Sequence, residues 1–127
     1  MHKPALASFL AVALALAGCN DRPEMTVEPD PVVTNTTVWA RFDRPINGRA
    51  VDQYWVVIAP AGAPPSHYSE ATRLFVDRSA YGIQLKAPAE PGEYEVRLHG
   101  DWPKDEYHLV RTVPLHVLPA NDAISAR

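Results

Sequence analysis

Apolar and polar residues alternate along the middle of the chain, and this period limits its fold more than any other feature. Tyr94, Val96 and Leu98 alternate with charged or polar residues. The same two-residue period recurs in three further stretches, 34–42, 81–87 and 109–117. Because successive side chains of a β-strand point to opposite faces, each stretch predicts a strand with one buried face. The continuous apolar run 54–58 predicts a central strand covered on both faces, or a strand near a sheet edge. A further short stretch, 73–76, is a candidate strand.

Proline and glycine separate the predicted strands. Of the 127 residues, 13 are proline and six are glycine. Many of them fall between the alternating stretches, at 46–48, 60–65, 88–92 and 100–105. Proline breaks helix interiors, and beyond the first apolar run no ten-residue stretch has a helical period. Six or seven short strands at this spacing predict an all-β fold, a β-sandwich in one small domain.

Charge and cysteine content exclude several classes of function. Twelve basic and 15 acidic residues give a formal net charge of −3, so overall charge does not drive nucleic-acid binding. The chain has one cysteine, which excludes an intramolecular disulfide and a cysteine-based zinc site. We therefore predict no nucleic-acid partner.

The N-terminal segment has the pattern of a secretory signal. Lys3 gives a positive start, and the apolar run 5–17 follows it. This run is shorter than the ~20 apolar residues that a transmembrane helix needs. It ends in the tetrapeptide Leu-Ala-Gly-Cys at 16–19, which resembles the lipobox of bacterial lipoproteins at all four positions.

The lipobox resemblance implies that Cys19 is the point of lipid attachment. In that family the thiol receives a diacylglyceryl group, and the signal peptidase then cuts before the cysteine, here between Gly18 and Cys19. The new amino terminus is acylated as well, and two or more chains give stable attachment to a bilayer. Asn20, rather than aspartate, follows the cysteine, which implies delivery to the outer membrane, facing the periplasm.

The chain is therefore expected to have four parts. Residues 1–18 form the signal peptide with its signal helix, and residues 19–31 form the lipidated cysteine and a disordered, flexible tether rich in proline and charge. As polyproline II, such a tether reaches roughly 35–40 Å. Residues 32–118 form the sandwich, and residues 119–127 form a disordered tail.

A second resemblance refines the predicted sandwich. Tyr94 follows a tight Pro-Gly turn at the start of a late strand, which resembles the tyrosine corner of immunoglobulin-like folds. Its hydroxyl is then expected to bond to the backbone near Ala87 or Pro88. The chain also resembles an Ig-like module that stands beside von Willebrand factor A-type domains in bacterial envelope proteins. The resemblance lies in three segments, 52–58, 85–98 and 109–117. The module implies a fold and an envelope location, and no catalytic residue.

Serine and histidine give little sign of catalysis. Ser66, Ser69 and Ser79 lie in predicted loops, and none is in a Gly-x-Ser-x-Gly elbow. His67 beside Ser66 is not a triad, because adjacency in sequence does not give the required geometry. We predict no enzyme activity and no cofactor.

His99 and His108 flank a predicted hairpin loop and are weak candidates for metal ligands. Strand alternation puts both on the face opposite Leu98 and Leu109, with Asp101 close by. Two histidines and a carboxylate suit zinc or copper. Because a third ligand at a defined spacing is missing, we predict two exposed histidines on a solvated face and no metal site.

Aromatic side chains in two loops suggest a binding surface. The candidates are Trp102 and Tyr107 in one loop, and His67 and Tyr68 in another. Aromatic residues on the loops of a rigid scaffold are common binding anchors. Trp102 can equally fold back and cap the open end of the core. Trp39 and Trp55 are expected in or near the core.

These observations predict a non-enzymatic envelope lipoprotein with two partners, the bilayer through acylated Cys19 and another envelope protein. One alternative is an inhibitor or accessory subunit of a periplasmic enzyme, which inserts the Trp102 loop into a cleft. A second is a glycan or peptidoglycan binder that stacks sugars on Trp102 and Tyr68. A third is metal handling through His99 and His108.

Overall fold

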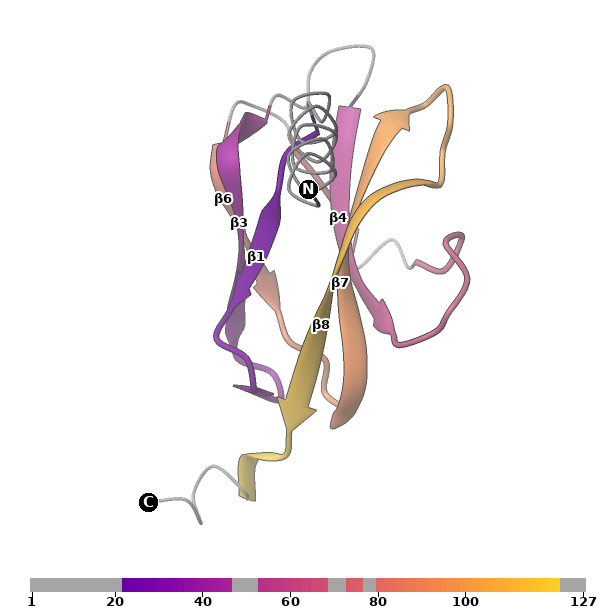
Figure 1. Cartoon of the computed structure of the whole chain (residues 1–127). Helices are drawn as coiled ribbons and strands as arrows, with labels where there is room; N and C mark the ends of the chain where they lie inside the picture. The colour runs from indigo at the N-terminus through magenta and orange to yellow at the C-terminus, as the bar shows by residue number, and fades with distance from the viewer. Residues whose placement is uncertain (1–21, 47–52, 69–72, 77–79, 122–127) are drawn as a thin grey trace, which may run out of the picture.

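The protein folds into two β-sheets that pack face to face (Figure 1). The computed structural model describes residues 22–46, 53–68, 73–76 and 80–121. The all-β prediction is confirmed, although the described residues form eight strands instead of six or seven. The strands are β1 (Met25–Glu28), β2 (Val32–Val33), β3 (Thr37–Ile46), β4 (Gln53–Pro60), β5 (Leu74–Phe75), β6 (Ala80–Lys86), β7 (Gly92–Trp102) and β8 (His108–Leu118).

The strands divide into a three-stranded and a five-stranded sheet. The three-stranded sheet has the order β1-β3-β6, and the five-stranded sheet has the order β2-β8-β7-β4-β5. Pairing is antiparallel except between β2 and β8, which are parallel. The long β7–β8 hairpin and its neighbour β4 form the centre of the larger sheet, which positions the candidate site on its outer face.

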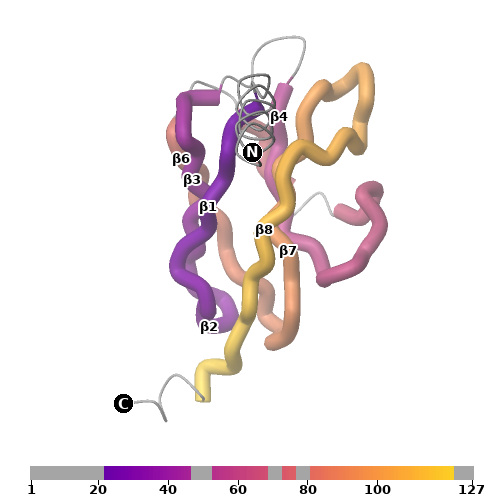
Figure 2. Tube along the Cα trace, viewed as in Figure 1, coloured from indigo at the N-terminus to yellow at the C-terminus, as the bar shows by residue number. Residues whose placement is uncertain are grey.

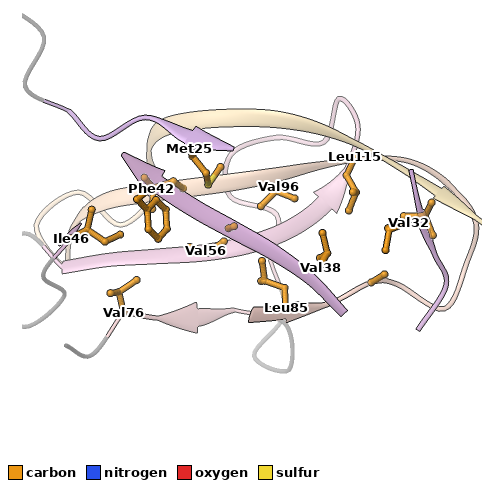
Figure 3. Packing of buried hydrophobic residues seen from close by; sticks show 14 residues of the cluster. Met25, Val32, Val38, Phe42, Ile46, Val56, Val76, Leu85, Val96 and Leu115 are labelled. Carbon is orange, nitrogen blue, oxygen red and sulfur yellow. The ribbon is translucent and has the colours of Figure 1, made fainter. Parts of the chain in front are cut away.

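The main core lies between the two sheets (Figure 3). Alternate residues of β3 and β7 supply much of it, as the two-residue period predicted. Its buried members are Met25, Val32, Val38, Ala40, Phe42, Ile46, Val56, Val76, Leu85, Ala87, Val96, Leu98, Leu115 and Val117. Burial of apolar surface at ~25 cal/mol per Å² is the main force that holds the sheets together.

The prediction of a flexible tether over 19–31 is wrong for its described part. Met25 is buried, and β1 pairs with β3 from Met25↔Phe42 to Glu28↔Trp39. Met25 and Val27 face the core because they repeat at the strand period, a signal that the surrounding prolines and charges concealed. The folded domain therefore includes β1 and does not start at Val32. Residues 19–21 lie outside the described residues.

Tyr94 makes a hydrogen bond to the backbone upstream of it, with a different acceptor from the one predicted. Its hydroxyl donates to the Glu90 carbonyl at 2.9 Å, and not to Ala87 or Pro88. Gly92, which lies between the two residues, has a φ of 149°, a conformation that L side chains rarely adopt and that glycine adopts readily. The Ala87 N–H instead donates to the Thr36 carbonyl at 2.8 Å.

The two ends of the chain were predicted to carry a signal helix and a disordered tail. The predicted signal peptide, residues 1–18, and the last six residues, 122–127, lie outside the described residues. Among the residues that the structure describes, no helix has the length and apolar character needed to cross a bilayer. The β8 strand ends at Leu118, one residue before the predicted tail, 119–127, begins. Only residues 119–121 of that tail are described.

Candidate functional site

The outer face of the five-stranded sheet carries a second buried layer. Trp55, Val57 and Ala59 are fully buried on β4, although their neighbour Val56 faces the core between the sheets. Because successive residues of a strand point to opposite faces, these three lie on the outer face. The apolar run 54–58 is thus covered on both sides, as one of the two predicted arrangements required.

Arg97 on β7 fastens the segment after β4 to this outer face. Its side chain is only 4% exposed, and its guanidinium donates to the Pro64 carbonyl at 2.9 Å and to the Ala63 carbonyl. The same group donates to a carboxylate oxygen of Glu95 at 2.8 Å. Hydrogen bonds from a charged donor stabilise more than those from a neutral one. Arg97 therefore holds a loop in place, a role that its position in an alternating strand did not suggest.

Replacing Arg97 with methionine should lower the free energy of unfolding by about 1.5–3 kcal/mol, because two backbone carbonyls and Glu95 lose a charged donor. Urea denaturation measures this change. Arg41→Met is the matched control, since Arg41 pairs with Glu28 at sites where the two side chains are 50% and 59% exposed. Such a surface pair contributes at most about 1 kcal/mol. Equal losses in both variants would contradict the fastening role.

Six ring side chains form what we call the outer aromatic cluster. The members are Trp55, Tyr68, Phe75, His99, Trp102 and Tyr107. Trp55 is its centre: it stacks on His99 with centroids 4.0 Å apart and meets Tyr68 edge-on at 5.6 Å. Each well-placed aromatic pair adds about 0.5–1.5 kcal/mol beyond burial. The cluster is therefore a packed unit on the sheet surface.

Arg73 enters the cluster as a cation. Its guanidinium carbon lies 4.1 Å from the centre of the Tyr68 ring, 4.9 Å from that of Phe75 and 5.2 Å from that of Trp55. Cations over aromatic faces gain about 0.5–2 kcal/mol each. The sequence predicted a short strand over 73–76, and β5 lies within it. It did not predict Arg73 and Phe75 as members of the site, because their place depends on the pairing of Phe75 with Trp55 across β4 and β5.

His99 corrects the prediction of two exposed histidines. Its side chain is fully buried against Trp55, and neither ring nitrogen has a hydrogen-bond partner of normal geometry in the described part of the chain. Burial lowers the pKa of His99 to about 4, and the backbone of Tyr107 opposes this shift only in part. His99 is therefore neutral at pH 7 and packs as an aromatic ring.

His99 and His108 do not share a face, so they do not form a common metal site. A register shift between Leu98 and His99 pairs His99 with Leu109, and Gly100 with His108. His99 therefore shares the outer face with Leu109, while His108 lies on the other face. The prediction assumed regular alternation without this register shift, and it therefore put both histidines on one face. In the described ranges, no three His, Cys, Asp or Glu side chains gather as metal ligands.

His108 takes part in a polar group at the end of β7. Its Nδ1 pairs with a carboxylate oxygen of Asp101, which also accepts from Arg22 at 3.3 Å. The hydrogen bond from His108 and, after it, that from Arg22 hold the pKa of Asp101 below its usual range. This group joins the start of the described chain to the β7–β8 hairpin.

The structure brings together the two loops that the sequence suggested separately. The ring centroids of Tyr68 and Tyr107 lie 6.1 Å apart. Trp102 is half-buried and meets Phe75 edge-on at 4.9 Å, so it packs within the cluster and does not protrude. His67 is exposed, and its backbone N–H donates to the Pro64 carbonyl at 2.9 Å.

The cluster has an exposed apolar rim. Tyr107 and Leu109 are each 36% exposed. Leu109 lies opposite His99, which lies opposite Trp55, so the buried row of β4 and β7 continues to the surface on β8. Trp39 lies apart from this face, on β3 of the other sheet, with the Arg41 guanidinium 4.8 Å from its ring centre. It is half-buried and outside the main core.

Comparison with known proteins does not place the chain in a family. No protein-family model matches the chain, and no curated protein matches it. The class that the fold and site define is a small two-sheet β-domain with an aromatic cluster on one outer face. The function is therefore argued from this geometry and from the sequence motifs.

Proposed function

We propose that this protein is an outer-membrane lipoprotein that faces the periplasm and presents an immunoglobulin-like sandwich as a non-enzymatic binding module. The anchor is supported by the lipobox at 16–19, which directly follows the apolar run of a signal sequence. The immunoglobulin-like assignment is supported by the two packed sheets and by the Tyr94–Glu90 hydrogen bond.

The outer aromatic cluster is the surface that we assign to a protein partner. The observation that carries this assignment is the exposed rim of Tyr107 and Leu109, which continues a fully packed row of rings. Aromatic and aliphatic anchors on a rigid base lose little conformational entropy on binding. Trp102 is held against Phe75, so neither a Trp102 wedge nor a Trp102–Tyr68 sugar platform gains support.

Crosslinking in intact cells of the natural host, followed by fractionation, tests both parts. Cys19→Ser should leave an uncleaved protein without acyl label, because serine lacks the nucleophilic thiol. Gly18→Ala is its matched control, because the lipobox accepts either small residue. Tyr107→Ala should keep the anchor and lose the crosslinked partner. Tyr81→Ala should keep both, because Tyr81 is 65% exposed on the other sheet.

Two results would contradict the proposal. Cleavage and acylation of the Cys19→Ser protein as in the wild type would remove the anchor. A crosslinked species that survives Tyr107→Ala, or that Tyr81→Ala removes equally, would place the partner elsewhere than on the aromatic rim.

A further inference from the structure

We propose that one end of the domain faces the membrane, and that the tip of the β7–β8 hairpin, residues 103–106, lies at the lipid headgroups. The inference rests on the proposed acylation of Cys19 and adds to it an orientation. It follows from where the folded chain begins and from what the beginning is fastened to.

The connection from the lipid anchor to the fold is short. Arg22 is the third residue after Cys19, and an extended chain covers at most about 3.3–3.6 Å per residue, or roughly 11 Å in all. The headgroup region on each side of a bilayer is itself about 5–8 Å thick. An acylated Cys19 therefore keeps the start of the fold within about one headgroup layer of the membrane surface.

The start of the fold is held by several contacts and does not extend the linker. Arg22 donates to Asp101 at 3.3 Å, and the Glu24 N–H donates to the Asp43 carboxylate at 2.9 Å. Arg111 on β8 donates to the Glu24 carboxylate at 3.1 Å. These contacts tie the start of the described chain to the end of β3 and to both strands of the hairpin.

The contacts of Arg22 place the hairpin tip at the membrane-facing end. Figures 1 and 2 show the start of β1 and the β7–β8 connection at the same end of the domain. The end of β8 and the short strand β2 lie at the opposite end (Figure 2). The turn before β7, which contains Glu90, also belongs to that far end, since Gly92 pairs with Val117.

The tip meets the headgroups because of the short linker and not because of charge. Pro103, Lys104, Asp105 and Glu106 are all exposed. One lysine against two carboxylates gives the tip no net attraction to anionic lipid. The orientation should therefore depend on linker length and not on the anionic lipid content of the bilayer.

Fluorescence quenching on vesicles tests the orientation. Cys19 is the only cysteine and its thiol is consumed by acylation, so an introduced cysteine is the only free thiol. The full acylated protein carries a fluorophore at Lys104→Cys or at Glu90→Cys, both exposed sites. The vesicles are phosphatidylcholine with a fraction of lipid bearing a nitroxide headgroup. We expect severalfold stronger quenching at position 104 than at position 90, unchanged when phosphatidylglycerol is added.

A linker insertion is the matched control. About twelve Gly/Ser residues between Asp21 and Arg22 add a flexible reach of about 20 Å, and should remove most of the difference between the two labels. Equal quenching at both positions, or stronger quenching at position 90, in acylated protein without the insertion would overturn the orientation. A protein that carries no acyl mass and does not bind vesicles would instead overturn the proposed anchor.

Discussion

Replacing Trp55 with alanine should lower the free energy of unfolding by about 3–5 kcal/mol, the range for a large buried aromatic residue. Trp55 is fully buried, stacks on His99 and meets Tyr68, and the Arg73 guanidinium lies over its ring. Its loss removes the centre of the outer aromatic cluster. Urea denaturation of the domain followed by circular dichroism measures the change.

Two further variants keep this prediction testable if the alanine variant does not fold, since small domains are stable by only ~5–15 kcal/mol. Trp55→Phe retains a ring against His99 and should cost less than Trp55→Ala. Trp39→Ala removes a half-buried tryptophan from the other sheet, where Arg41 lies over the ring, and should cost less as well. An equal loss for Trp39→Ala and Trp55→Ala would mean that the outer layer adds nothing beyond ordinary surface packing.

The domain should lose stability as the pH falls from about 6.5 to about 4, because His99 resists protonation in the folded state. The pKa of His99 falls from 6.5 to about 4, mainly through burial. Between these values the unfolded chain binds a proton that the folded protein does not, so its stability rises with pH. The contribution is complete above pH 6.5 and is lost as pH approaches 4. It amounts to about 3 kcal/mol, since one pKa unit equals about 1.4 kcal/mol.

His99→Phe is the variant that isolates this effect. Phenylalanine keeps a ring against Trp55 and does not titrate, so the slope of stability against pH between 4 and 6.5 should largely disappear. Arg97 and His108 are the neighbours that also lower the pKa of His99, and both remain in this variant. Asp43 and Asp101 act below this window, because their pKa values are lowered from 3.8. An unchanged slope in His99→Phe would contradict the assignment.

The strand period of the sequence predicts most of the fold, and it fails where local irregularities intervene. The period located β3, β6, β7 and β8, and the run 54–58 located a strand covered on both faces. It missed β1, where two apolar residues stand among prolines and charges. It also misplaced His108, because one register shift at Leu98–His99 reverses which side chains share a face. No composition signal marks such a bulge.

The candidate site was harder to predict than the fold. Aromatic content identified Tyr68, Trp102 and Tyr107, but their contacts depend on how the chain after β4 folds back onto the sheet. Arg97 determines that course by binding two carbonyls 33 and 34 residues away in sequence. Arg73 and Phe75 join through a two-residue strand. Contacts of this separation are properties of the tertiary structure, and no local pattern encodes them.

The early start of β1 has a consequence for how a partner is found. A domain on a long tether samples a deep volume above the bilayer. The proposed acylation of Cys19 would instead confine this domain to a thin layer along the bilayer. Its encounters then become a two-dimensional search, in which confinement raises the effective concentration of any partner held at the same height. A partner in the same membrane is favoured over one free in the periplasm, even where the two present identical surfaces to Tyr107 and Leu109.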